Sequence, residues 1–256
     1  MALITLLTDA GESDHYVAAI KARILSLHST AVIVDISHSI RHFDIAHGAF
    51  VMRSVFREFP AGTIHIVGVD SAGSRGDQFV VVKLEGHYFI GTDNGLLSLI
   101  SDHPPESIWT LSHSNTTTFP EKDVFAPAAA RLATGTDPSE IGAPAHEIKR
   151  FIDRQVKATR KQIIGTVIRV DHYGNLITNI PRQAFEVLSQ GKNYTIQFGG
   201  EKFPRMHTSY NHAEQGECVI VFNDLGFLEI GIYKGNASEL LGLSYDSVVN
   251  ITFEDP

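Results

Sequence analysis

The first 70 residues alternate between short apolar runs and segments with helical periodicity, and this alternation limits the possible folds more than any other feature. The apolar runs are residues 2–9, 31–37 and 62–70, and the helical segments are residues 13–28 and 43–60. Apolar residues recur every three or four positions in the first helical segment, at Val17, Ile20, Ile24 and Leu27. Ser13 is its expected N-cap. Uninterrupted apolar strands separated by helices predict a mostly parallel sheet covered on both faces.

Polar residues stand at the end of each of these three apolar runs. Asp9 ends the first run, Asp35 and Ser37 end the second, and Asp70 ends the third. Ligands of open parallel sheets bind beyond the carboxyl ends of the strands, so these residues are expected at one binding rim. A carboxylate at this rim suits a ribose diol, because it accepts hydrogen bonds from two hydroxyl groups. Asp14 follows closely, although an acid there is also expected simply because helix N-termini favour negative charge.

The pattern changes after residue 79. Residues 79–84 and 87–91 flank Glu85-Gly86 and predict a hairpin, and a further helix is expected over residues 123–135. Residues 137–162 are polar, contain two prolines and show little period, so we interpret them as a linker. Six strand-like runs follow, which favours a small antiparallel barrel, with one helical turn at residues 237–242. The chain is therefore predicted to be an α/β protein with an N-terminal α/β domain (1–150), a linker (151–162) and a smaller C-terminal antiparallel β-barrel domain (163–256).

Composition excludes several classes of protein. The 256-residue chain has a net charge of −8 and scattered Lys and Arg, so it lacks the basic stripe of a nucleic-acid-binding protein. Its one cysteine, Cys218, cannot form an internal disulfide, which suits a reducing cytoplasm. No apolar run approaches the ~20 residues that a membrane-spanning helix needs. We expect a cytoplasmic protein with neither nucleic-acid nor membrane partners.

Common catalytic and cofactor motifs are absent. The turn after the first strand lacks the GxGxxG pattern of dinucleotide-binding proteins, and neither HExxH nor GxSxG occurs. The thirteen histidines lack the grouping of zinc sites, so we expect no metal. The turn at residues 172–179 contains Asn175, and an amide side chain can bind an adenine edge through paired hydrogen bonds, although asparagines in turns usually have only a structural role.

Six stretches carry a resemblance to a known family. They are residues 4–21, 35–50, 86–100, 118–135, 167–180 and 226–242. Together they resemble the S-adenosyl-L-methionine (SAM) hydroxide adenosyltransferases, or SAM hydrolases, which are related to bacterial fluorinase and chlorinase. The resemblance covers almost the whole chain. It implies an N-terminal α/β domain and a C-terminal β-barrel, SAM as substrate without a cofactor, and a homotrimer with each ligand between the N-domain of one subunit and the C-domain of its neighbour.

The resemblance also implies the residues around the ribose and the reaction centre. Asp9 is expected to hold the ribose hydroxyls, and Phe43 to line the nucleoside pocket. Thr118 and Phe119 are expected near the ribose and the reacting carbon.

A second group of residues is implied around adenine and methionine. Asn175 and the backbone at Ala237, which follows Asn236, are expected to bind adenine. Asp14 and Asp171 are expected to face the methionine ammonium, where two carboxylates can meet one cation. The expected ring-stacking residues are Tyr173 and Tyr210.

The implied reaction is attack by water or hydroxide at C5′ of SAM, which gives adenosine and methionine. The sulfonium leaves readily, so the enzyme mainly has to align the nucleophile, exclude bulk water and orient or deprotonate the attacking water. Members of the family do so with an Asp-Arg-His triad, from a VDPGVGT-x-R loop and a TFHGRD motif. This chain has VDSAGSRGD and TFPEKD in these places.

The triad is therefore only partly matched. Asp70 corresponds to the catalytic aspartate, but Asp77 occupies the arginine position and Arg75 lies two residues earlier, where it is the candidate catalytic arginine. Pro120 stands where the histidine belongs, and proline has neither an ionisable group nor an N–H. The residues considered as substitutes are Glu121, Lys122, His113 and Arg75.

Three functions stay open at this point. The first is SAM hydrolysis with an altered water-orienting set. The second is a catalytically impaired protein, such as a sensor, that binds SAM or adenosine. The third is a relative that uses another nucleophile. Halide is disfavoured because Asp70 would place a negative charge beside it.

Overall fold

The structure is a computed structural model that describes residues 3–112, 117–152 and 154–254. The chain forms two compact units, Met1–Ile152 and Asp153–Pro256. Each unit has its own sheet and its own hydrophobic core.

The first unit is built on a seven-stranded sheet with the order β2-β1-β3-β5-β4-β6-β7. Its strands are β1 (Leu3–Thr8), β2 (Val32–Ser37), β3 (Ile64–Gly68), β4 (Phe79–Leu84), β5 (His87–Thr92), β6 (Ser107–Leu111) and β7 (Gly142–Ala145). Strands β2, β1 and β3 are parallel, as the alternation of strands and helices predicted. Strand β5 also pairs parallel with β3, which the alternation did not indicate. Strands β4 and β5 form the predicted hairpin around Glu85-Gly86.

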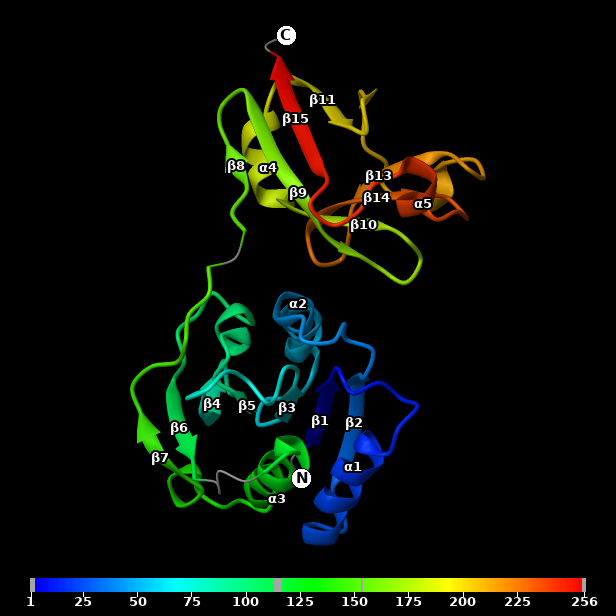
Figure 1. Cartoon of the computed structure of the whole chain (residues 1–256). Helices are drawn as coiled ribbons and strands as arrows, with labels where there is room; N and C mark the ends of the chain where they lie inside the picture. The colour runs from blue at the N-terminus through cyan, green and yellow to red at the C-terminus, as the bar shows by residue number, and fades with distance from the viewer. Residues whose placement is uncertain (1–2, 113–116, 153, 255–256) are drawn as a thin grey trace. The chain divides into compact units, whose positions relative to one another are not determined.

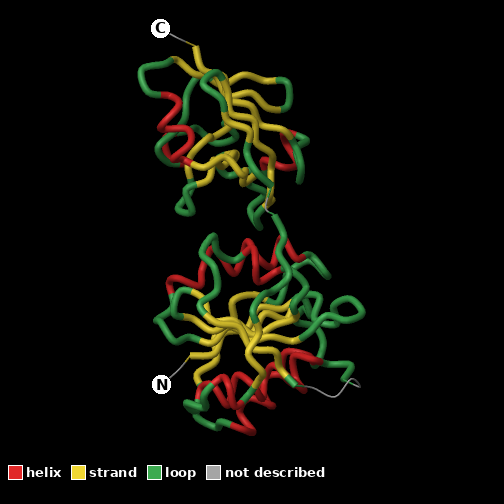
Figure 2. The backbone as a smooth tube through the Cα atoms, turned by 90° about the vertical axis from the view of Figure 1, so that its left-hand side faces the viewer, coloured by secondary structure: helices red, strands yellow, loops and turns green. Residues whose placement is uncertain are grey.

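Helices cover both faces of this sheet (Figure 1, Figure 2). Helices α1 (Tyr16–Leu27) and α3 (Ala126–Ala133) pack together on one face, and α2 (Ile45–Val55) lies on the other. Short helices η1 (Phe56–Glu58) and η2 (Leu96–Leu99) follow α2 and β5, and η3 (Glu121–Phe125) is a π-helix that leads into α3. The predicted stripe on α1 is buried at Ile20 and Ile24 but exposed at Leu27. The predicted N-cap Ser13 is wrong, because the helix begins at Tyr16 with His15 as N-cap.

The interpretation of residues 137–162 as a linker without regular structure is wrong in part. Residues Pro138–Glu140 form the short helix η4, and β7 pairs with β6 at the edge of the sheet. Proline is tolerated in an edge strand, where its missing N–H does not interrupt a ladder. Because proline usually argues against a strand, the sequence around Pro144 did not indicate β7. Strand β8 (Lys157–Ala158) already pairs with a strand of the second unit.

The second unit is a curled antiparallel sheet that forms half of a barrel. Its order is β12-β11-β15-β9-β10-β14-β13, with β8 on β9. Its other strands are β9 (Gln162–Val170), β10 (Leu176–Pro181), β11 (Asn193–Phe198), β12 (Glu201–Phe203), β13 (Cys218–Phe222), β14 (Phe227–Ile232) and β15 (Val248–Glu254). The helical turn expected near residue 237 is α5 (Ala237–Leu241), and η5 (Tyr210–His212) is a short 3-10 helix. Helix α4 (Arg182–Ser189) is absent from the sequence-based prediction.

No helix in the described part of the chain is long and apolar enough to cross a membrane.

Candidate functional site

Asp9 connects three segments at the rim of the parallel sheet. It follows β1, and its Oδ2 accepts hydrogen bonds from the main-chain N–H of Phe43 at 2.9 Å and of Asp70 at 3.2 Å. The Nδ1 of His42 lies 2.9 Å from the carbonyl oxygen of Asp9. Both Phe43 and Asp70 have positive φ, at 62° and 47°, which costs free energy for residues other than glycine. The Asp9 carboxylate therefore stabilises two strained turns and brings predicted site residues together.

The main chain at Asp70 is also held by the side chain of Asn94. The Asn94 Nδ2 donates to the carbonyls of Val69 at 3.0 Å and Asp70 at 3.2 Å. Burial raises the pKa of Asp70, and the negative charges of Asp9 and Asp77 raise it further. This carboxyl group consequently retains a proton to higher pH than an ordinary aspartate, which suits a group that exchanges protons with water.

The loop after Asp70 carries an ion pair that the sequence did not indicate. The Asp77 side chain is 4% exposed, pairs with the Lys149 ammonium, and accepts the Ser74 N–H at 2.9 Å. Burial alone raises the pKa of Asp77, but these two partners outweigh it and hold the pKa below its usual value. Lys149 also donates its main-chain N–H to Asp93 at 2.8 Å. Where the resemblance places the family's arginine, this chain thus has a carboxylate neutralised by Lys149.

Arg75, the candidate catalytic arginine, lies on the exposed part of this loop. Within the described residues its guanidinium has neither a hydrogen bond nor an ion pair. The structure does not bring it into contact with Asp70 through any such bond.

The segment before α3 places Thr118 and Phe119 beside α1. Thr118 is exposed, and the Phe119 ring contacts the Tyr16 ring edge to face with centroids 5.2 Å apart. Pro120, at the family's histidine position, is buried directly before the π-helix. The Lys122 ammonium lies 3.3 Å from the Asp123 carboxylate and forms an ion pair with it. His113, another suggested substitute, lies outside the described residues.

Glu121 is buried close to the same rim. It is 9% exposed and packs against Gly68, where an added Cβ would lie 2.8 Å from the Glu121 Cγ. Burial raises the pKa of this carboxyl group, and the charge of Asp9 adds to the effect.

Two other acids of the predicted rim lie apart from these contacts. Asp14 is exposed in the turn before α1. Asp35 pairs with Lys21 at 2.5 Å and with His38 at 3.2 Å, so its carboxylate stabilises the β2–α1 side of the unit.

In the second unit, Asp171 organises the turn that carries Asn175. Its Oδ1 accepts the main-chain N–H groups of Tyr173 at 2.9 Å and Asn175 at 2.8 Å, and its Oδ2 accepts from the Asn175 amide at 3.0 Å. Both oxygens predicted to face an ammonium group therefore already have partners within the turn. Tyr173 is 76% exposed on the same turn.

The other predicted residues of this unit gather around two glycines. A Cβ on Gly174, whose φ is +84°, would lie 2.0 Å from the Asn236 Oδ1. A Cβ on Gly231 would lie 2.3 Å from the Tyr210 hydroxyl and 2.8 Å from the Asn175 Oδ1. Only glycine permits these approaches, so Asn175, Tyr210 and Asn236 share one small area.

Hydrogen bonds fix the orientation of this cluster. The Tyr210 hydroxyl donates to Glu229 at 2.6 Å, and burial together with Glu229 raises the pKa of Tyr210. The Asn236 side chain caps α5 by accepting the Glu239 N–H at 3.1 Å, and Ala237 begins that helix fully buried. No local pattern in the sequence indicates Glu229, since its role depends on the pairing of β14.

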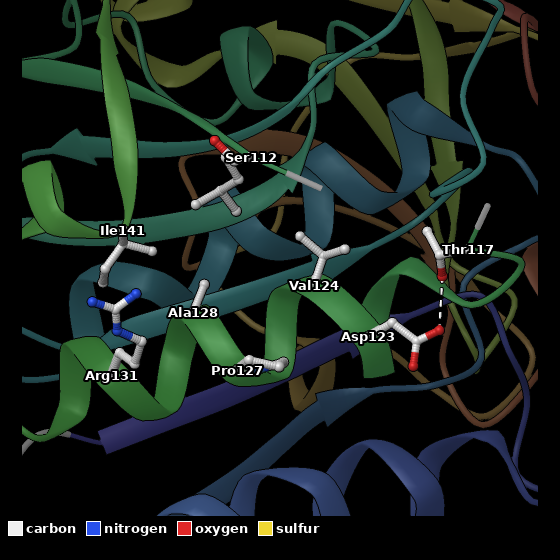
Figure 3. Close-up of a pocket in the computed structure, with 9 residues that line it drawn as sticks. Ser112, Thr117, Asp123, Val124, Pro127, Ala128, Arg131 and Ile141 are labelled. Carbon is white, nitrogen blue, oxygen red and sulfur yellow. Dashed lines mark hydrogen bonds between the residues drawn. The ribbon is translucent and has the colours of Figure 1, made fainter. Parts of the chain in front are cut away.

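A cavity of about 290 Å³ lies along α3 (Figure 3). Thr117 and Asp123, joined by a hydrogen bond of 2.8 Å, lie at one end, and Arg131 and Ile141 lie at the other. None of the predicted substrate residues lines it. Among the described residues, no group of three or more His, Cys, Asp or Glu side chains is arranged to hold a metal ion.

Each of the two units matches a domain of one known protein family. Residues 4–142 match the SAM hydroxide adenosyltransferase N-terminal domain, and residues 165–250 match the SAM hydroxide adenosyltransferase C-terminal domain. The chain belongs to the SAM hydroxide adenosyltransferase family. The resemblance of the six sequence stretches to this family is therefore confirmed, as is the two-domain α/β and antiparallel architecture.

Several curated members of the family are similar over nearly their whole length. The (R)-S-adenosyl-L-methionine hydrolase of Methanocaldococcus jannaschii is 29% identical, with 98% of this chain and 96% of the relative covered. A protein of the same name from Thermus thermophilus is 28% identical, with 94% and 95% covered. The fluorinase of an Actinoplanes species is 26% identical, with 89% and 90% covered.

A solved structure also shares the fold. The crystal structure of an uncharacterized conserved protein from Thermotoga maritima superimposes with a TM-score of 0.90 at 28% identity, and covers 98% of this chain and 100% of that one.

Proposed function

We propose that this protein is an enzyme that hydrolyses SAM to adenosine and methionine. The observation that carries the proposal is the match of both units to the SAM hydroxide adenosyltransferase domains. It is supported by the curated relatives named (R)-S-adenosyl-L-methionine hydrolase in several species. Three expected residues, Asp9, Phe43 and Asp70, are joined by hydrogen bonds at the carboxyl ends of β1 and β3.

In the proposed reaction, water attacks C5′ in line with the sulfonium. The new C–O bond forms as the C5′–S bond breaks, sulfur keeps the electron pair, and one proton leaves the attacking water. Asp9 is proposed to bind the ribose hydroxyls, since its Oδ1 makes no hydrogen bond to the described residues while Oδ2 holds two turns. Asp70 is proposed to orient the water and receive its proton. No cofactor or metal is invoked, because the sulfonium is already an activated leaving group.

The adenine site is proposed to come from the second unit. Asn175 supplies an amide side chain beside Tyr210 and Asn236, and the main chain at Ala237 lies at the start of α5. We propose a homotrimer in which this cluster and the rim of the first unit of a neighbouring subunit bind one ligand together. We further propose that the enzyme works in the cytoplasm.

A specific observation supports a second function, that of a SAM- or adenosine-binding protein with impaired turnover. Pro120 and Asp77 occupy two positions of the family's triad, and neither supplies a histidine or an arginine. The two functions share the ribose and adenine residues and differ only in turnover. Incubation of the purified protein with SAM, followed by chromatography of adenosine and methionine, separates them: product formation supports hydrolysis, and binding without product supports the second function.

A further inference from the structure

Glu121 is a buried carboxylic acid behind the ligand rim. It begins the π-helix that follows Pro120, and π-helical turns occur frequently at functional sites. Its side chain fits against β3 because position 68 is glycine: an added Cβ would lie 2.8 Å from its Cγ and 3.3 Å from its Oε1. The Ser71 hydroxyl is nearby, buried and without a well-formed hydrogen bond. The carboxyl group thus lies between the ends of β1 and β3, close to Asp9.

No cation of the described residues neutralises Glu121. The titratable groups on the elements packed against it have other partners: Lys21 pairs with Asp35, Lys122 with Asp123, and Arg131 with the Glu140 carbonyl, while Arg23 lies near Asp123. His65 of β3 bonds with Thr5 and with His87 of β5. Tyr16 packs against Phe119, and Asp93, which follows β5, accepts from Lys149. The charged group that acts on Glu121 is Asp9, which has the same sign.

A buried carboxyl group without a counter-charge favours its neutral form. Burial and the charge of Asp9 both raise the pKa of Glu121 in the free protein. A cation that entered beside Asp9 would reverse this balance, because it would stabilise the carboxylate.

We propose that Glu121 supplies the buried negative charge that recognises the sulfonium of the substrate and distinguishes it from the uncharged nucleoside product. The proposal rests on the proposed function, in which Asp9 holds the ribose and the sulfonium is bonded to the adjacent C5′. Glu121 loses its proton when the cationic ligand binds. During turnover the positive charge on sulfur disappears as the C5′–S bond breaks, and Asp70 takes the proton of the attacking water. Glu121, which released one proton to solvent on binding, then takes one proton back from solvent and becomes neutral again.

Isothermal titration calorimetry in buffers of different ionisation enthalpy measures the protons released on binding. The ligands are adenosine and a hydrolysis-resistant SAM analogue in which a protonated amine replaces the sulfonium. The proteins are the full-length wild type, Glu121→Gln, and Glu58→Gln as a control at an exposed glutamate of the same unit. The titrations span about pH 5 to 7, above the ordinary glutamate pKa of about 4.3.

We expect proton release when the wild type and Glu58→Gln bind the cationic analogue, and no release with adenosine. In Glu121→Gln the release is lost, and affinity for the analogue falls about tenfold while adenosine affinity stays within about twofold. Equal release in Glu121→Gln and wild type, equal release with both ligands, or none in the wild type would overturn the inference.

A second measurement does not depend on how well the variant folds. Carbon-13 NMR of the carboxyl group in the wild type should show the Glu121 resonance move from the protonated to the ionised position with the analogue, but not with adenosine. Failure of both ligands to bind overturns the inference and the proposed function together. Binding of SAM without product overturns hydrolysis alone, and the proton count still decides the role of Glu121.

Discussion

The Oδ2 of Asp9 accepts the main-chain N–H of Asp70 at 3.2 Å, and so joins the ends of β1 and β3. The same oxygen accepts from Phe43 at 2.9 Å. One carboxylate therefore couples the proposed ribose site to the proposed water site.

Replacement of Asp9 tests this coupling. We expect Asp9→Ala to weaken adenosine binding by about 10- to 100-fold, because hydrogen bonds to a charged group each contribute about 1.5–3 kcal/mol. Calorimetry with adenosine provides the measurement, and Glu12→Ala, an exposed acid in the following turn, is the control. Unchanged affinity in Asp9→Ala would show that the ribose binds elsewhere.

The glycine at position 174 tests the adenine cluster. Gly174→Ala should abolish adenosine binding, because its Cβ would overlap the Asn236 side chain. Gly216→Ala is a matched control: its φ of +88° resembles the +84° of Gly174, but no atom lies within 4 Å of its added Cβ. Both variants share a backbone strain of about 1–2 kcal/mol, so equal adenosine affinity in the two would refute the proposed site.

The Lys149–Asp77 pair is expected to matter more for turnover than Arg75. Lys149→Met leaves the nearly buried Asp77 carboxylate without its cation. The change should lower the free energy of unfolding by about 1 kcal/mol and slow the formation of adenosine from SAM about tenfold. Arg75→Gln should change the rate by less than about twofold. Chemical denaturation measures the stability of the two variants, and the adenosine assay measures their rates. A larger loss of rate in Arg75→Gln than in Lys149→Met would restore Arg75 as the triad arginine.

Burial of His65 is expected to make the free energy of unfolding fall in acid. Its Nδ1 lies 2.7 Å from the Thr5 hydroxyl and its Nε2 lies 3.2 Å from His87, and burial together with His87 lowers its pKa to about 3. An unfolded histidine titrates near pH 6.5, so the stabilisation is complete above that pH and is lost as pH falls toward about 3. The slope is up to about 1.4 kcal/mol per pH unit. Denaturation curves between these limits should show a smaller slope in His65→Gln than in wild type, whereas the exposed His172→Gln should match wild type.

The parallel strands and the alternating barrel strands were predictable, since each follows from local periodicity. Strand β7 was missed because Pro144 argues against a strand and four residues give little periodicity. Helix α4 was missed because eight residues after Pro181 provide barely two turns.

The site was predictable where a residue ends a strand, as Asp9 and Asp70 do. The Lys149–Asp77 pair joins residues 72 positions apart, and the burial of Glu121 depends on the glycine at position 68. Such contacts arise only when the chain is folded, so no local pattern in the sequence indicates them.

Hydrolysis of SAM by wild type and Asp70→Asn, measured as adenosine and methionine released over time, tests the central claim most directly. Asparagine tolerates the positive φ of position 70, so the variant keeps the turn while it loses the carboxylate. We predict that the wild type forms both products in equal amounts, and that Asp70→Asn is slower by about 10²- to 10⁴-fold with unchanged adenosine affinity. Tight SAM binding by the wild type with no product after prolonged incubation would contradict the account.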